Sequence, residues 1–163
     1  MSPDPELDRF PLAPKGRQFE DFSEGQTFDH HWGRTLNEGD NSLFATLALR
    51  FTPLYTNAEY ALAHGHPGVV VDPLLVLCTI VGLSVEDLSE GGGPFLGVGE
   101  VEFLQPVYPG DTLTARSLVV SKRESESRPQ FGIVTWQSEG RNQKGEVVVR
   151  YRRSNLVVKR NAA

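Results

Sequence analysis

The segment ALRFTPLYTNAEYA, residues 48–61, has the layout of a catalytic loop: an apolar helical run, a proline, an aromatic residue and a polar helix start. Its central positions hold Arg50, Thr52 and Tyr55. A guanidinium stays protonated until about pH 12, so Arg50 cannot accept a proton during catalysis. A phenol is a poor base because it ionises only near pH ~10, although a neighbouring cation favours the phenolate. We therefore expect Tyr55 to act as an acid or proton shuttle and Arg50 as its electrostatic partner, with Thr52 as a third catalytic candidate.

Three predicted helices hold this loop in place, and each starts at a polar cap. Asp40 precedes an apolar pattern at helical spacing, Asn57 precedes a second short helix, and Asp72 precedes the longest helix. Pro73 stands at the first position of the longest helix, and an almost unbroken apolar sequence continues to Leu83. A helix that is apolar on nearly every side is a buried one, so we expect this helix at the centre of the fold.

Strands are expected before and after the helical segments in the sequence. One short strand follows a turn at Glu24 and Gly25, and four segments rich in Val, Phe, Leu and Thr follow Pro94. These segments are residues 95–104, 111–121, 131–139 and 146–158. Short turn sequences separate them, so antiparallel pairing is expected. A curved antiparallel sheet wrapped around one long buried helix satisfies this order. The expected class is α+β, and a single hotdog domain fits it.

Composition narrows the possible partners. The chain has 16 Lys and Arg against 21 Asp and Glu, a net charge of −5, without a long basic run, which argues against nucleic acid. The single cysteine, Cys78, excludes an intrachain disulfide and is expected to be a small buried hydrophobe. His64 and His66 flank a glycine without further clustered His or Cys, so we expect no metal site and no cofactor.

The chain divides into an arm and one domain. Residues 1–18, acidic and rich in proline, are predicted to be a loose arm, and residues 19–160 a single compact domain. The arm has no apolar stretch of the kind found in signal peptides. The longest apolar run, about residues 69–83, is shorter than the roughly 20 residues needed to cross a bilayer. We expect a cytoplasmic protein without membrane contact.

Two stretches carry a family resemblance. VEFLQPVYPGDTL, residues 101–113, resembles the strand–turn–strand signature of MaoC-like hydratases and dehydratases of the hotdog superfamily. Residues 122–160 are similar to the C-terminal half of a narrower group, the mesaconyl-CoA hydratase relatives. The resemblance implies an enzyme that adds water across the α,β double bond of an enoyl thioester, or removes it. The thioester would be one of CoA or of acyl carrier protein.

The loop after the first helix departs from the family at its reactive positions. The family pattern is D-V-x-x-F-A-x-L-x-G-D-x-N-P-L-H-x-D, and the chain matches it at Asp40, Phe44, Ala45, Leu47, Pro53 and Leu54. Where the pattern has the catalytic Asp, an Asn, the catalytic His and a further Asp, the chain has Arg50, Thr52, Tyr55 and Asn57. Water addition needs a group that accepts a proton and one that delivers a proton. His66 is the first candidate to replace the missing imidazole.

The start of the long helix departs as well. The resemblance implies a glycine there whose N–H polarises the thioester carbonyl, whereas the chain has Asp72, Pro73 and Leu74. Pro73 has no N–H to donate, but the helix dipole and the Leu74 N–H could still stabilise an oxyanion. Asp40, chiefly a cap, and Asn57 complete the expected substrate contacts at this end. Positive charge for an anionic CoA is expected from Arg128, Arg150, Arg152 and Arg153.

Three functions are compatible with these residues. The first is an acyl-thioester hydratase or dehydratase with an altered catalytic pair. The second is a hotdog module that has lost its chemistry but still binds acyl thioesters or accompanies an active paralogue. The third is a repurposed lyase or cyclase. A single hotdog unit exposes a sheet edge and leaves its pocket half-built, so we expect a homodimer with residues 50–57 near the long helix of the partner.

Overall fold

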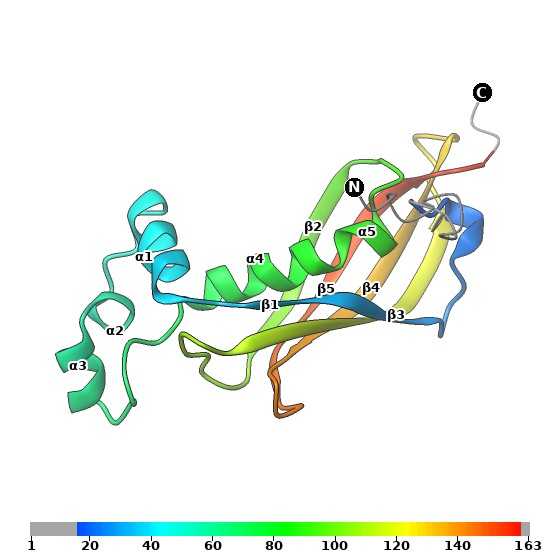
Figure 1. Ribbon diagram of the computed structural model, residues 1–163. Coiled ribbons are helices and arrows are strands. Elements are labelled where there is room, and N and C mark those ends of the chain that lie inside the picture. Colours follow the sequence, from blue (N-terminus) through cyan, green and yellow to red (C-terminus); the bar gives the residue numbers. More distant parts are fainter. Residues whose placement is uncertain (1–15, 161–163) are drawn as a thin grey trace, which may run out of the picture.

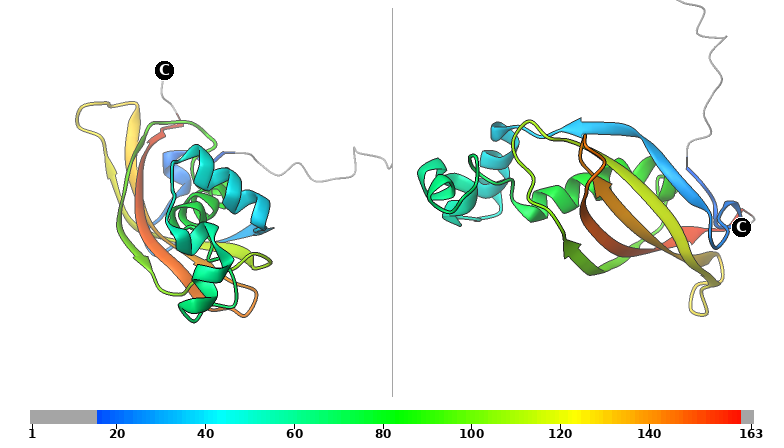
Figure 2. Two further views of the ribbon diagram at one scale, coloured as in Figure 1. Left: turned by 90° about the vertical axis from the view of Figure 1, so that its left-hand side faces the viewer. Right: turned by 90° about the horizontal axis from the view of Figure 1, so that it is seen from below.

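The computed structural model describes residues 16–160. Within this range five antiparallel strands form one sheet in the order β1-β3-β4-β5-β2, and the longest helix, α4, lies along its concave face (Figures 1 and 2). In chain order the elements are η2 (Phe19–Asp21), β1 (Thr27–Thr35), α1 (Glu38–Leu47), α2 (Pro53–Thr56), α3 (Ala58–Ala63), α4 (Pro73–Leu83), α5 (Val85–Leu88), β2 (Phe95–Phe103), β3 (Thr112–Glu124), β4 (Phe131–Arg141) and β5 (Val147–Val158). The predicted α+β architecture, a curved antiparallel sheet around one long helix, is confirmed.

Strand pairing follows chain order in only part of the sheet. β3, β4 and β5 form consecutive hairpins, but β2 pairs with β5 rather than with β3, the strand that follows it. The connection of residues 104–111 therefore crosses from one side of the sheet to the other. Within it, the Val107 carbonyl accepts a hydrogen bond from Val71 N (2.8 Å), just before α4 begins. The expectation that neighbouring strands pair fails here, and the crossing places the end of β2 beside the start of α4.

Helix α4 packs one face on the sheet and leaves another exposed. Val76 and Ile80 are buried in the core cluster that joins the helix to β3 and β5. Leu74, Cys78 and Gly82, spaced by four residues, are exposed. The predictions that this helix is buried on every side, and that Cys78 is buried, are therefore wrong for the single chain. The sheet curves around only part of the helix, and apolar composition alone does not reveal which face a second molecule would cover.

Two of the three predicted helix caps are confirmed. The Asn57 Oδ1 accepts a hydrogen bond from the N–H three residues on (3.1 Å), and Asp72 Oδ1 from the N–H two residues on (2.8 Å). The predicted cap at Asp40 is wrong, because α1 begins earlier with Asn37 as its N-cap. The two side chains form a reciprocal capping box: Asn37 Oδ1 accepts from Asp40 N (3.0 Å), and Asp40 Oδ2 accepts from Asn37 N (3.1 Å).

Residues 16–160, the described part of the chain, hold neither a helix that could span a membrane nor a cluster of metal-ligating side chains. In that range no helix has the length and apolar character required to span a membrane. In the same range no three His, Cys, Asp or Glu side chains gather as they would around a metal ion. The predicted arm, residues 1–18, lies almost entirely outside the described part of the chain.

Candidate active site

Helices α1, α2 and α3 form a lobe, here called the overhang, that projects beyond the start of α4 (Figure 1). The buried side chain of Asn41 fastens this lobe to the helix. Its Nδ2 donates to the carbonyl oxygens of Tyr55 (2.9 Å) and Val70 (3.1 Å), and its Oδ1 accepts from Asp72 N (2.9 Å). A buried amide that uses both ends holds its partners in one geometry. Asn41 therefore fixes where the Tyr55 loop stands relative to α4.

An ion pair lies where the family pattern has its catalytic carboxylate. Arg50 Nε donates to Asp72 Oδ2 at 2.8 Å, and the Asp72 side chain has no exposed surface. The hydrogen bond and the charge of Asp72 raise the pKa of Arg50 above its ordinary value. The other Asp72 oxygen is the cap of α4 and accepts from Leu74 N. The Leu74 N–H is thus already used and Asp72 is enclosed in the single chain, and substrate contact by these two residues stays a prediction.

A cavity of about 240 Å³ lies under the overhang, beside the start of α4 and the end of β2. Two ionisable side chains, Tyr55 and His66, line it. The other lining residues are apolar or uncharged: Leu54, Val70, Val71, Pro73, Val76, Phe103, Leu104, Gln105, Pro106, Val107 and Val148. Ligand pockets for drug-sized molecules begin near about 300 Å³. The cavity therefore suits a short acyl group, held against apolar walls with a phenol and an imidazole in reach.

His66 meets a residue that the sequence did not single out. Its Nδ1 lies 2.9 Å from the hydroxyl oxygen of Tyr108, which stands in the turn that leads into β3. On the other side of the site, the guanidinium carbon of Arg50 lies 5.8 Å from the centroid of the Tyr55 ring. The structure thus brings together three of the four predicted catalytic residues, Arg50, Tyr55 and His66.

The remaining predicted site residues have other surroundings. Thr52 is exposed at the start of α2 without a side-chain capping bond, and Asn57 is engaged in its capping bond. The Asp40 carboxylate accepts a hydrogen bond from Arg34 (2.7 Å) beside its capping role. Pro73 lines the cavity, in agreement with its predicted place near the substrate. Substrate contact by Thr52, Asn57 and Asp40 stays a prediction.

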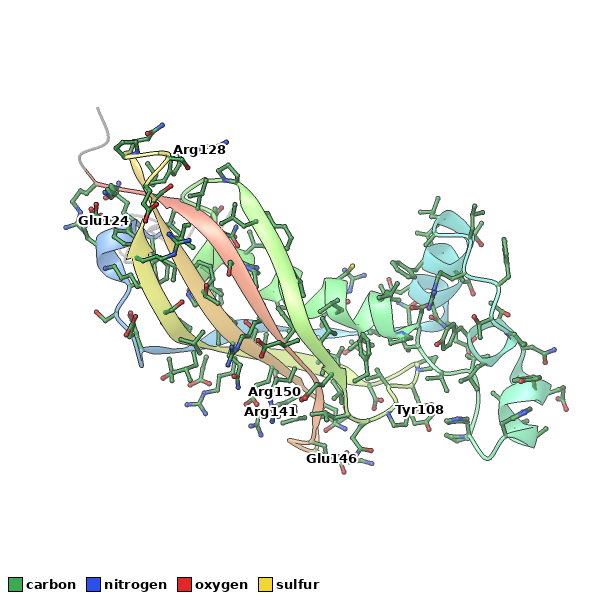
Figure 3. The ribbon with its side chains drawn as sticks, turned by 180° about the vertical axis from the view of Figure 1, so that it is seen from behind. Tyr108, Glu124, Arg128, Arg141, Glu146 and Arg150 are labelled. Carbon is green, nitrogen blue, oxygen red and sulfur yellow. The ribbon has the colours of Figure 1, made fainter. Side chains whose placement is uncertain are left out.

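The predicted arginines do not gather around the cavity. Arg128 lies in the β3–β4 turn, at the end of the sheet away from Tyr108 (Figure 3). Arg150 pairs with Glu102 (3.6 Å) and Arg152 with Glu100 (3.0 Å), side by side along the β5–β2 pairing. Arg153 is buried and donates to Ser84 Oγ (3.1 Å), Ser89 Oγ (2.9 Å) and Asn155 Oδ1 (3.1 Å). Arg128 and Arg153 therefore lie away from this cavity in the single chain, and their contact with a CoA stays a prediction.

Sequence reasoning missed Asn41 as the fastening of the loop and Tyr108 as the partner of His66. Asn41 carried a signal, since an Asn inside an apolar helical pattern must satisfy its amide wherever it is buried. Tyr108 carried none, because it lies 42 residues from His66 and only the crossing connection of residues 104–111 brings the two together.

Comparison with known proteins shows the family of the chain. The chain matches the family model described as mesaconyl-CoA hydratase over residues 4–163. It is 42% identical over 158 residues to a mesaconyl-CoA hydratase of Haloarcula hispanica. This match covers 96% of the present chain and 44% of the relative. The chain therefore spans about half the length of the curated relatives it matches.

Solved structures show the same fold. A MaoC domain protein dehydratase from Chloroflexus aurantiacus superposes with a TM-score of 0.85 at 37% identity, over 90% of this chain and 42% of that one. A Mycobacterium tuberculosis protein described as having a double hotdog fold gives a TM-score of 0.82 at 24% identity, over 90% of this chain and 45% of that one. The predicted hotdog domain is thereby confirmed. The chain belongs to the mesaconyl-CoA hydratase family of MaoC-like hotdog proteins.

Proposed function

We propose that the chain works as an acyl-thioester hydratase or dehydratase. It would add water across the α,β double bond of an enoyl-CoA or enoyl carrier-protein thioester, or remove it from the 3-hydroxyacyl form. One observation carries the proposal: an apolar cavity under the overhang has both Tyr55 and His66 in its wall, in a chain of this family. An acyl group held there would meet two side chains able to exchange protons.

In the proposed chemistry His66 and Tyr55, which both line the cavity, take the roles of the catalytic Asp and His of the family. The family has its catalytic histidine at the position of Tyr55, and in this chain His66 supplies the imidazole instead. His66 accepts a proton from water as the water oxygen bonds to the β-carbon. The phenol of Tyr55 delivers a proton to the α-carbon, and the proton on the imidazole then restores the phenol, directly or through solvent. Arg50 keeps a positive charge beside the Tyr55 ring during this exchange.

A second hotdog unit is part of this proposal. Large apolar side chains are exposed along β2, on both of its faces: Phe95, Leu96, Val98, Val101 and Phe103. On α4 the exposed face holds Leu74, Cys78 and Gly82. Exposed apolar surface of this extent at a sheet edge marks an association surface. We propose a homodimer that covers these faces and closes the cavity mouth.

Light scattering of the purified full chain tests the dimer. We expect a dimer at micromolar concentration. Cys78→Glu, which places a charge on the exposed face of α4, should give monomers, whereas Thr114→Glu on the outer face of β3 should not. A native protein that is monomeric at this concentration would refute the assembly. The expected cytoplasmic location also stays a prediction, open to cell fractionation.

Turnover decides the main proposal. The full chain is incubated with mesaconyl-CoA and crotonyl-CoA, and with their hydrated counterparts, while the absorbance of the enoyl thioester is followed. We expect loss of the enoyl thioester with at least one acyl group. The His66→Gln variant should be roughly 10²–10⁴-fold slower, as is typical when a general acid–base group is removed. A well-folded dimer that turns over none of these esters would contradict the proposal.

One observation favours the reading in which chemistry has been lost. Arg50, ion-paired with Asp72, stands where the family has a carboxylate, and Pro73, which has no N–H, stands where the family has a glycine with a free N–H. If the native chain is inactive, restoring the family residues should create activity. The restoring variant combines Arg50→Asp, Thr52→Asn, Tyr55→His and Pro73→Gly, with Asp72→His added. Asp72→His is needed because two carboxylates would otherwise face each other.

A further inference from the structure

Tyr108 is held firmly by its own turn. Its N–H donates to Asp111 Oδ2 (2.8 Å), and Asp111 N donates to the Tyr108 carbonyl (3.0 Å). The side chain is half-buried and its hydroxyl reaches His66 Nδ1 at 2.9 Å. Figure 3 places Tyr108 at the end of the sheet that adjoins the overhang. Because these two hydrogen bonds hold the Tyr108 backbone in place, its half-buried side chain can present the hydroxyl to the His66 ring from a fixed position.

His66 depends on this contact. The residue lies between α3 and α4, in a stretch without regular structure, and its own N–H bonds to the Ala61 carbonyl (3.1 Å). Across residues 16–160, Tyr108 is the one residue whose side chain forms a hydrogen bond with the His66 ring. Because Nδ1 is engaged by the hydroxyl, Nε2 is the ring nitrogen that remains for a ligand in the cavity.

We infer that Tyr108 is a positioning residue: its hydroxyl accepts the Nδ1–H of His66 and leaves the lone pair of the ring on Nε2. This rests on the proposed function, in which His66 exchanges the proton. The hydroxyl accepts a hydrogen bond from Nδ1–H whether the imidazole is neutral or protonated, so the ring keeps its orientation throughout the cycle. A phenol adds no charge beside the ring, so its effect is on orientation and tautomer.

A double-mutant cycle separates this role from a merely structural one. Tyr108→Phe should lower kcat by roughly 10–100-fold with KM unchanged, the range typical of removing an outer hydrogen-bond partner. In the His66→Gln background the same change should cause no further loss, because the ring that it orients is gone. Tyr60→Phe is the matched control: Tyr60 stacks on His64 with ring centroids 4.0 Å apart, on α3 outside the cavity wall. It should leave kcat unchanged.

A measurement that needs no turnover completes the test. Nitrogen-15 NMR of the ring of His66 should show the Nδ1–H tautomer in the native protein and a mixture of tautomers in Tyr108→Phe. An Nε2–H tautomer in the native protein would overturn the inference, as would losses that simply multiply in the cycle. Absence of turnover in the native chain would refute the proposed function alone, since the tautomer would still report whether Tyr108 orients the ring.

Discussion

Arg50 Nε lies 2.8 Å from Oδ2 of Asp72, a carboxylate without exposed surface. The pair places a cation on the loop, where the family pattern has a carboxylate, and a carboxylate at the start of α4. Asp72 has no free oxygen, since its second one caps the helix. Neither residue can therefore serve as the base for water. The groups left in contact with the cavity are Tyr55 and His66.

The ion pair also predicts a stability effect. Arg50→Met removes the only cation paired with Asp72 among the described residues and leaves a buried carboxylate with a single partner. We expect a loss of about 1–3 kcal/mol in the free energy of unfolding, the cost of an under-satisfied buried group. Chemical unfolding in urea measures it. Arg50→Met combined with Asp72→Asn should recover most of the loss, because the neutral amide can still accept the Leu74 N–H bond.

Arg34 gives the matched control for that prediction. It pairs with Asp40 at the same kind of distance, 2.7 Å, but its side chain is 57% exposed and Asp40 keeps its capping bond with Asn37. Arg34→Met should therefore cost at most about 0.5 kcal/mol, as exposed ion pairs do. Equal losses for the two arginine variants would show that burial of Asp72 does not matter.

The second prediction concerns the phenol of Tyr55. Tyr55→Phe deletes one hydroxyl from the cavity wall and leaves the backbone bond from Asn41 intact. We expect turnover to fall by at least about 10²-fold, while the free energy of unfolding changes little. Steady-state kinetics and urea unfolding of the same preparation check both parts. Full activity in Tyr55→Phe would leave His66 as the sole proton-transfer group.

Local chemistry explains which elements were predictable. The Asp72–Pro73 start of α4 and the Asn57 cap were correct because capping involves neighbours in sequence. The α1 cap was misplaced because Asn37 and Asp40 are both good cap residues and each bonds the other's N–H. Which of the two residues caps α1 depends on where β1 ends, and the local sequence pattern does not predict that position.

Long-range relationships explain what was missed. The pairing of β2 with β5 and the contact of His66 with Tyr108 join residues far apart in sequence. Arg128 and Arg153 were assigned to ligand binding by charge alone, yet one stands at the far end of the sheet and the other in the core. The sequence shows how many charged residues the chain has, but the sheet topology determines where those residues lie.

The third prediction concerns the turn that aims Arg50. Leu49 has a φ of 54° and follows the cap of α1, where Arg50 N bonds to the Ala45 carbonyl (2.8 Å). This left-handed position normally belongs to glycine, and the family pattern has glycine there. The Leu49 side chain is 73% exposed, so it contributes little packing in the single chain. Leu49→Gly should therefore raise the free energy of unfolding by about 0.5–1 kcal/mol.

Leu47 is the matched control, because it is 75% exposed but lies inside α1. Leu47→Gly should lower the free energy of unfolding by about 0.5–1 kcal/mol, since glycine weakens a helix interior. Urea unfolding of the two variants should thus give opposite signs. Destabilisation by Leu49→Gly would mean that the Leu49 side chain is held by something absent from the single chain, such as the partner in a dimer.

The fourth prediction concerns pH and the buried His30. Its Nδ1 lies 2.7 Å from Asp87 Oδ2 on α5, and its Nε2 lies 2.9 Å from Ser117 Oγ on β3. Burial lowers the pKa of His30 below its ordinary 6.5, and the charge of Arg153 acts in the same direction, against the opposing effect of Asp87. In the unfolded chain the same imidazole takes up a proton below about pH 6.5.

The sign follows from proton uptake. As pH falls below about 6.5, the unfolded state binds a proton that the folded state resists, so the free energy of unfolding falls, by up to about 1.4 kcal/mol per pH unit. Above that pH His30 is neutral in both states and contributes no pH dependence. Urea unfolding at pH 7.5, 6.5 and 5.5 should show the decline in the native chain and a shallower one in His30→Gln. The neighbouring His31 is the control, since its side chain is 53% exposed, 3.6 Å from Glu86 and beside the ring of Trp32. His31→Gln should keep the full decline, and a His30→Gln profile parallel to the native one would show that another group carries the acid sensitivity.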